Sequence, residues 1–183
     1  MLSVSTSRLD LIAATIDLLE AELHDRARLS LLLNAAIPDN WPPPLNDIAS
    51  MEWMLRYLQH NSDSNGWSMW YFVLRDGPGG RPLAIGNGGF KGKPSADGTV
   101  EVGYSIMENN QRQGYASEAV NALLGWAFMH PGITRIVAET LPDLTPSIRL
   151  LDKLGFRLVG KGSEEGVIRY GLLRGSYEQD TSF

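Results

Sequence analysis

The sequence EVGYSIMENNQRQGYASEAV, residues 101–120, joins a predicted strand to a predicted helix through a short polar turn. Polar and apolar residues alternate over 100–107, which is typical of a half-buried strand. After Gly114 the apolar residues recur at helical spacing as far as Phe128. No conventional side-chain cap stands between the two elements, so we expect the helix to begin with its first N–H groups unpaired.

This turn is a predicted anion-binding site. A helix that begins at about Gly114 carries about half a positive charge at its first turn. The N–H groups of residues 112–116 can converge on a phosphate if the turn curls. Glycine at position 114 lets the backbone approach a phosphate closely, and Arg112 can add a direct charge. A plain helix start with exposed polar residues is the alternative interpretation of the same stretch.

The rest of the chain reads as strands and helices of ordinary length. We expect strands at 8–14, 67–75, 82–91, 100–107, 133–141, 156–161 and 167–173. We expect helices at 16–33, 48–60, about 114–130 and 145–155, and a rigid proline-rich loop at 35–47. The fold class predicted is α/β: a single domain over residues 1–183 with a mixed, mostly antiparallel, twisted sheet of about seven strands and helices on both faces.

Composition excludes several classes of function. The 183 residues are 43% hydrophobic with a formal net charge of −5, so we expect a folded protein that binds no nucleic acid. The chain has no cysteine, and its three histidines lack metal-ligand spacing, so no metal site is predicted. No segment has the length or pattern of a membrane span or a signal peptide, so we expect a cytoplasmic protein that does not bind a membrane.

The opening stretch and two further segments resemble the GNAT superfamily of acetyl-CoA-dependent N-acetyltransferases. Gln111, Gly114 and Ala116 occupy the marked places of that family's loop, and LPDLTPSIRLLDKLGFRLVG (141–160) is similar to its next loop, helix and strand. STSRLDLIAA (5–14) resembles the first strand of the branch that contains the ribosomal-protein N-terminal acetyltransferases. The resemblance covers most of the C-terminal half and the first strand.

The resemblance implies a binding site for acetyl-CoA. It implies that the strand at 100–107 splays away from the strand at 133–141 and that the pantetheine arm pairs with backbone in the gap. The pyrophosphate is then expected on residues 112–117, in agreement with the anion site. The implied cofactor-binding residues are Tyr104, Ser105, Ile106, Gln111, Arg112, Gln113, Gly114, Tyr115, Ala116, Ser117 and Ser147.

The implied reaction is direct attack of a primary amine on the thioester. An amine with a pKa of about 8–10 is mostly protonated at neutral pH, so a carboxylate is expected to take its proton unless the amine arrives neutral. Three carboxylate positions are candidates for this base: Glu101, Glu139, and the neighbouring pair Glu164 and Glu165. Ser147 is the candidate contact to the thiol sulfur, and Trp41 is a candidate wall of the acceptor site.

Two positions depart from the family pattern. Leu144 stands where many members have an asparagine that contacts the cofactor, and Leu151 stands where many have a tyrosine that acts as general acid. A non-catalytic acyl-CoA-binding sensor of the same fold is therefore the alternative function, and an unrelated phosphate-ligand protein is a third. The acceptor can be a protein N-terminus or a small-molecule amine. The edge of the final hairpin leaves both a monomer and a homodimer open.

Overall fold

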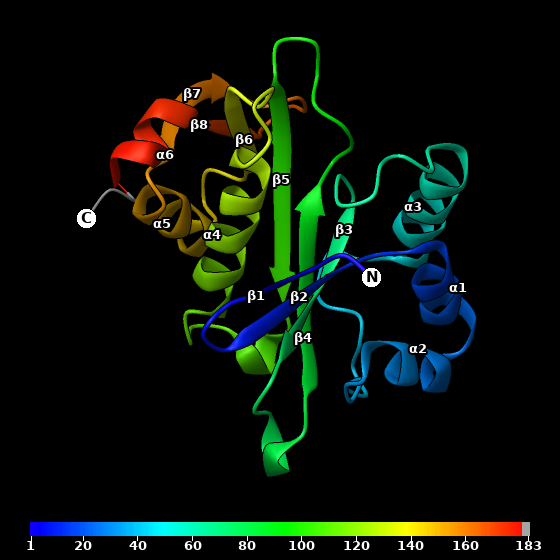
Figure 1. Cartoon of the computed structure of the whole chain (residues 1–183). Helices are drawn as coiled ribbons and strands as arrows, with labels where there is room; N and C mark the ends of the chain where they lie inside the picture. The colour runs from blue at the N-terminus through cyan, green and yellow to red at the C-terminus, as the bar shows by residue number, and fades with distance from the viewer. Residues whose placement is uncertain (181–183) are drawn as a thin grey trace.

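The computed structural model describes residues 1–180, which form one eight-stranded sheet with the order β1-β2-β3-β4-β5-β6-β8-β7 (Figure 1). Neighbouring strands are antiparallel except β5 and β6, which are parallel. The α/β class and the mixed, mostly antiparallel sheet are confirmed. The strands are β1 (Ser3–Ser5), β2 (Leu9–Ala13), β3 (Met69–Leu74), β4 (Leu83–Phe90), β5 (Thr99–Ile106), β6 (Arg135–Thr140), β7 (Arg157–Lys161) and β8 (Ile168–Leu173).

The described helices include one that the sequence analysis missed and one that it drew too long. The helix expected over 16–33 is two helices, because the Asp25 carboxylate accepts a hydrogen bond from the Arg28 N–H at 3.0 Å and starts a second one. The C-terminal helix α6 was not expected. The helices are α1 (Ile16–His24), α2 (Arg26–Leu33), α3 (Ile48–His60), α4 (Tyr115–Phe128), α5 (Thr145–Lys153) and α6 (Arg174–Asp180), with short 3₁₀ turns η1 (Pro78–Gly80) and η2 (Glu108–Asn110).

Helices cover both faces of the sheet, as expected, and β3 shows why. Its six residues are all buried, and their side chains alternate between two hydrophobic cores. Trp70 and Phe72 pack in the core that includes α4, whereas Tyr71 and Val73 pack with α1, α2 and α3. Figure 1 shows α1, α2 and α3 on one side of the sheet and α4 on the other.

The parallel strands β5 and β6 separate after a short contact. They pair only where Thr99, Val100 and Glu101 face residues 135–137. From Val102 to Ile106, β5 keeps its pairing with β4 on the opposite edge. No strand among residues 1–180 pairs with the edge of β5 that faces β6 over this length. The splay implied by the family resemblance is therefore present, and α4 begins immediately beyond its open end.

Candidate functional site

The turn before α4 has the geometry expected of an anion site. Gly114 is the N-cap of α4 with φ of 84°, and no side chain caps the helix. Arg112 also has a positive φ, 59°, so the chain curls before the helix starts. The N–H groups of residues 112–117 donate no hydrogen bond to any group in residues 1–180. They are consequently available to an anion at the positive end of the helix dipole.

Glutamine side chains hold the turn from within. Gln111 Nε2 donates to the Ile106 carbonyl at 3.0 Å, and Gln113 Nε2 donates to the Asn109 carbonyl at 3.2 Å. Both bonds tie the turn to the end of β5 and to the 3₁₀ turn η2. Gln113 therefore has a bracing role, and it lines neither of the cavities described below.

The N-terminal hairpin holds the turn from outside. The Glu118 carboxylate on α4 accepts hydrogen bonds from Thr6 Oγ1 at 2.5 Å, Ser7 Oγ at 3.0 Å and the Arg8 N–H at 2.8 Å, and it pairs with Arg8 Nε at 2.7 Å. Burial raises the pKa of Glu118, but the hydrogen bonds from Thr6, Arg8 and Ser7 outweigh it and bring the pKa to about 2. The carboxylate is therefore ionised at neutral pH.

Arg8 itself reaches the turn. Its guanidinium donates to the Gln113 carbonyl at 3.0 Å and lies 4.4 Å from the centre of the Tyr115 ring. The sequence analysis used this arginine only as part of the opening strand motif. Its contact with the turn spans more than a hundred residues of chain, and no local pattern predicts it.

Two cavities meet at the splay between β5 and β6. One, the loop cavity, has a volume of about 520 Å³ and lies along the turn and α5; Ile106, Arg112, Gly114 and Ser117 are among its lining residues. The other, the sheet cavity, has about 510 Å³ and lies over β4 and β5, where Met51, Met54, Phe90 and Val102 line it. The residues that line both cavities are Leu45, Tyr104, Ser105, Leu144 and Ser147.

The structure gathers nearly all the predicted cofactor-binding residues around the loop cavity. Gln113 is the exception. Arg149 and Lys153, one turn apart on α5, also line it and were not predicted. A pair of cations at this helical spacing was visible in the sequence. The predicted lining residues are Tyr104, Ser105, Ile106, Gln111, Arg112, Gly114, Tyr115, Ala116, Ser117 and Ser147.

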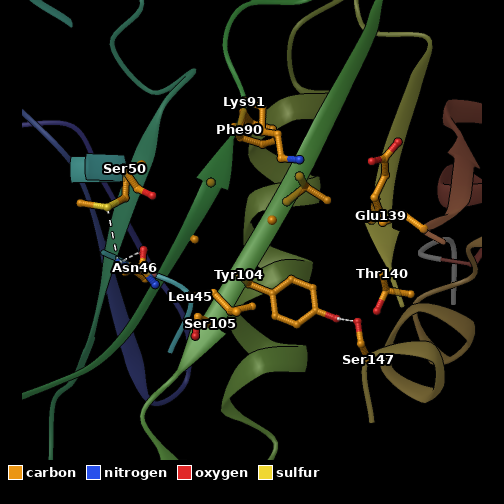
Figure 2. A pocket seen from close by; sticks show the side chains of 18 of the residues that line it. Leu45, Asn46, Ser50, Phe90, Lys91, Tyr104, Ser105, Glu139, Thr140 and Ser147 are labelled. Carbon is orange, nitrogen blue, oxygen red and sulfur yellow. Dashed lines mark hydrogen bonds between the residues drawn. The ribbon is translucent and has the colours of Figure 1, made fainter. Parts of the chain in front are cut away.

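At the junction of the cavities, Tyr104 faces Ser147. The Tyr104 hydroxyl and Ser147 Oγ are 3.0 Å apart, and Figure 2 shows the phenol extending from β5 toward the start of α5. Burial raises the pKa of Tyr104, and the hydrogen bond with Ser147 offsets this only in part. The phenol is thus neutral over the physiological range. Ser105 Oγ donates instead to the Pro44 carbonyl at 2.7 Å.

The sheet cavity is walled mainly by apolar side chains, and one pair of amide side chains also lines it. Asn87 Nδ2 donates to Asn46 Oδ1 at 3.0 Å. Leu45 and Asn46 line it and come from the proline-rich loop that also contains Trp41. Trp41, the predicted wall residue, instead donates to Glu22 at 2.8 Å and stacks on Tyr71, and it lines neither cavity.

The four candidate carboxylates differ in their positions and in their hydrogen-bond partners. Glu139 lines the sheet cavity but is only 7% exposed, and it accepts hydrogen bonds from the Ser163 N–H and Oγ and from Arg169 Nε. Burial raises its pKa, but the Ser163 and Arg169 hydrogen bonds outweigh it, so the pKa is lowered overall. A carboxylate held in this way is a weak proton acceptor.

The other three candidates differ in position. Glu101 forms an ion pair with Lys91 and lines neither cavity. Glu164 is exposed, lines the sheet cavity, and forms no ion pair with a residue in 1–180. Glu165 is exposed and lines neither cavity. Glu164 is therefore the carboxylate that is both placed at the cavity and available to take a proton.

A helix N-terminus whose amides are unpaired within residues 1–180, placed beside splayed parallel strands of a mixed sheet, is the arrangement that the resemblance to GNAT acyltransferases implied. The chain belongs to the GNAT acetyltransferase family. The family model described as an acetyltransferase (GNAT) domain matches residues 16–157. The chain is also 29% identical, over 164 residues, to the uncharacterized N-acetyltransferase YjdG of Bacillus subtilis strain 168, a match that covers 90% of this chain and 95% of that relative.

Solved structures share the fold at lower identity. The ribosomal L7/L12 α-N-protein acetyltransferase RimL, in complex with coenzyme A, has a TM-score of 0.66 and 19% identity, covering 94% of this chain and 98% of its own. The spermidine/spermine N-acetyltransferase SpeG of Vibrio cholerae has a TM-score of 0.66 and 18% identity, covering 97% and 100%. These two neighbours act on different acceptors, so the fold alone leaves the acceptor of this chain open.

Two features are absent from residues 1–180. No helix in residues 1–180 is long and apolar enough to cross a membrane. No group of three or more histidine, cysteine, aspartate or glutamate side chains there is arranged to hold a metal ion. The single-domain organisation over 1–183 and the absence of a metal stay predictions.

Proposed function

We propose that the protein transfers the acetyl group of acetyl-CoA to a primary amine, either a small molecule or a protein N-terminus, by direct attack. The observation that carries the proposal is the set of N–H groups at 112–117 that are unpaired within residues 1–180, beside a loop cavity that shares five lining residues with a second cavity. This arrangement gives one site for the cofactor and an adjoining site for an acceptor.

The residues present fit acetyl-CoA in two respects. The curled turn presents several backbone amides to a pyrophosphate, and Arg112 adds a cation at the same place. The free edge of β5 from Val102 to Ile106 can pair with the amides of the pantetheine arm as an added strand would. Acetyl-CoA supplies the activated acetyl group when bound, and the thioester is expected at the junction beside Tyr104 and Ser147.

On the acceptor side, the sheet cavity positions the amine and Glu164 takes its proton, directly or through water. Glu164 is favoured over Glu139 because the Glu139 oxygens are already occupied by Ser163 and Arg169. It is favoured over Glu101 because Glu101 lies outside both cavities and pairs with Lys91. An amine that arrives neutral would need no such base.

The alternative of a non-catalytic acyl-CoA sensor depends on Leu144 and Leu151, which offer no polar group. Leu151 is fully buried in the core, and Leu144 is exposed at the junction. The hydroxyl groups of Tyr104 and Ser147 lie at the same junction, and they supply the polar groups that the two leucines lack. A catalytic function is therefore favoured.

A cytoplasmic location stays a prediction.

The test is turnover with a panel of acceptors. The protein is mixed with acetyl-CoA and with primary amines that include apolar amines, polyamines and peptides with free N-termini. Release of free thiol, together with an acetylated product found by mass spectrometry, is the expected result. Saturable coenzyme A binding without thiol release from any amine would support the sensor. Failure to bind coenzyme A would support an unrelated phosphate ligand.

A further inference from the structure

The junction of the two cavities contains hydroxyl groups from three residues, and they are not equivalent. Ser105 Oγ is occupied as a donor to the Pro44 carbonyl at 2.7 Å. Tyr104 and Ser147 bond to each other at 3.0 Å, and either oxygen can donate. The other two residues that line both cavities are Leu45 and Leu144, whose side chains have no hydrogen-bond donor. Any proton that reaches a thiolate from a side chain at this junction must therefore come through the Tyr104–Ser147 pair.

The chemistry of a leaving thiolate favours the pair over either hydroxyl alone. Negative charge develops on sulfur as the carbon–sulfur bond breaks, and a hydrogen-bond donor there stabilises it. A serine hydroxyl is a much weaker acid than a phenol, whose usual pKa is about 10. A serine that receives a hydrogen bond from a phenol can pass its own proton to sulfur without becoming a free alkoxide.

We propose that Tyr104 and Ser147 form one proton relay, in which Ser147 donates to the thiol sulfur of coenzyme A and Tyr104 donates to Ser147. The proposal rests on the proposed function and deepens it. Ser147 is then the catalytic residue, because it contacts the reacting atom, and Tyr104 is a positioning residue that acts through it.

The proton balance of the relay is complete. The amine nitrogen forms a bond to the carbonyl carbon, the carbon–sulfur bond breaks, and its electron pair stays on sulfur. The Ser147 proton moves to sulfur and the Tyr104 proton moves to Ser147, after which water returns a proton to the phenol. The proton released by the amine passes to Glu164 and then to water. No oxidant or further reactant is required.

The surroundings of Tyr104 suit this role. Burial raises its pKa, so the phenol stays protonated and remains a donor at the pH where an amine is reactive. The charged side chains that line the two cavities are Lys91, Arg112, Glu139, Arg149, Lys153 and Glu164. None of them changes when the Tyr104 hydroxyl is removed, so a difference between the protein and its Tyr104→Phe variant reports the hydroxyl itself.

The test measures the thiol pKa of bound coenzyme A, which needs no acceptor. Coenzyme A is titrated in complex with the protein, and the thiolate is followed by its ultraviolet absorbance. The bound thiol should titrate about one pKa unit higher in Tyr104→Phe than in the unchanged protein, a tenfold loss of thiolate stability. Ser147→Ala should give a rise at least as large, and the double variant should give no further rise, because both changes break one relay.

The chain offers a matched control in a second tyrosine–serine pair. Tyr57 and Ser64 bond at 3.2 Å, and Tyr57 lines neither cavity. Tyr57→Phe should leave the thiol pKa unchanged. If Tyr104→Phe fails to fold, a fluorinated tyrosine at position 104 serves instead. Its stronger donor should lower the thiol pKa.

Two outcomes would overturn the relay. One is equal thiol pKa values in the unchanged protein and in Tyr104→Phe. The other is a double variant whose rise equals the sum of the two single rises, which would mean that the hydroxyls act independently. Both outcomes require that coenzyme A binds. Loss of binding in the unchanged protein would instead contradict the proposed function, so the two failures are distinguishable.

Discussion

At the scale of single residues, the four carboxylates that the sequence named as candidate bases differ in their partners and in their position relative to the cavities. Glu139 is enclosed by Ser163 and Arg169 of the last hairpin, and Glu101 is paired with Lys91. Only Glu164 combines a place at the sheet cavity with the absence of an ion pair in residues 1–180. The difference arises from contacts of β6 with the last hairpin for Glu139 and from the contact of β5 with the end of β4 for Glu101, and residue type and spacing encode neither.

This assignment predicts unequal effects for two neighbouring substitutions. Glu164→Gln should lower kcat by about tenfold to a hundredfold, since it removes the proton acceptor for the amine. Glu165→Gln, which has the same chemistry one residue away and lines neither cavity, should stay within twofold. Steady-state rates of thiol release with one acceptor check both. Equal activity of Glu164→Gln and the unchanged protein would mean that the amine arrives neutral.

A second residue-scale prediction concerns stability. Because the pKa of Glu139 is lowered in the folded protein, its contribution is complete above the unfolded pKa and is lost as the pH falls through the folded one. Glu139→Gln should lower the free energy of unfolding at pH 7 by about 1–3 kcal/mol, since Arg169 loses a buried partner. Denaturant unfolding measures the effect, with an exposed control such as Glu52→Gln. Loss of thiol release without loss of stability would show that Glu139 is the base after all.

At the scale of elements, the hairpin between β1 and β2 braces the start of α4. Glu118 on α4 binds Thr6, Ser7 and Arg8, and Arg8 reaches the Gln113 carbonyl and Tyr115. A turn that binds an anion through its backbone must be held in one conformation, because each amide must point at the ligand. We therefore propose that the hairpin supports the proposed cofactor site, although it does not line the loop cavity.

Glu118→Gln should consequently weaken coenzyme A binding by about three- to tenfold, which corresponds to the loss of about 0.6–1.4 kcal/mol of positioning energy. The pH dependence gives an independent check. The pKa of Glu118 is about 2 when folded against a usual 4.5, so the bracing is complete above pH 4.5 and is lost as the pH falls toward 2. Calorimetric affinity and thermal melting from pH 3 to 7 measure both. An unchanged affinity in Glu118→Gln would show that the turn holds itself.

Helix α5 carries a second prediction at this scale. Arg149 and Lys153 line the loop cavity one helical turn apart, and Arg112 lies on the same cavity. If the cavity binds the phosphates of coenzyme A as proposed, these three cations should make binding salt-dependent, since exposed charges are screened over about 8–10 Å at physiological ionic strength. Lys153→Ala should lower coenzyme A affinity several-fold at low salt and less at high salt. Lys93→Ala is the matched control, because Lys93 is a cation that lines neither cavity.

At the scale of the whole molecule, the sheet consists of two parts held by few strand contacts. Strands β1 to β5 and strands β6, β8 and β7 meet only over the three residue pairs between Thr99–Glu101 and 135–137. A ligand in the splay would contact both parts. We expect coenzyme A to slow amide hydrogen exchange along β5 from Val102 to Ile106 and to raise the melting temperature with its concentration. Protection that is confined to the turn before α4 would contradict pantetheine binding along β5.

Features set by local sequence patterns could be predicted, whereas contacts between distant parts of the chain could not. The segment 101–120 was predictable because its period changes from two to 3.6 within a few residues and no cap intervenes. β1 was missed because three residues give too short a pattern, and the break at Asp25 was missed because apolar residues continue on both sides. The Tyr104–Ser147 and Arg8–Gln113 contacts join distant parts of the chain, and only the folded structure brings them together.

The position of the N-terminal hairpin also matters for how the protein is handled. Thr6 and Arg8 lie a few residues from Met1, and they contact Glu118 on α4 and the Gln113 carbonyl in the proposed anion-binding turn. Trimming the leading residues, or fusing a bulky affinity tag directly to Met1, would disturb that helix start from a distance. Weak cofactor binding by a sample trimmed into this hairpin would therefore say little about a chain that keeps Thr6 and Arg8.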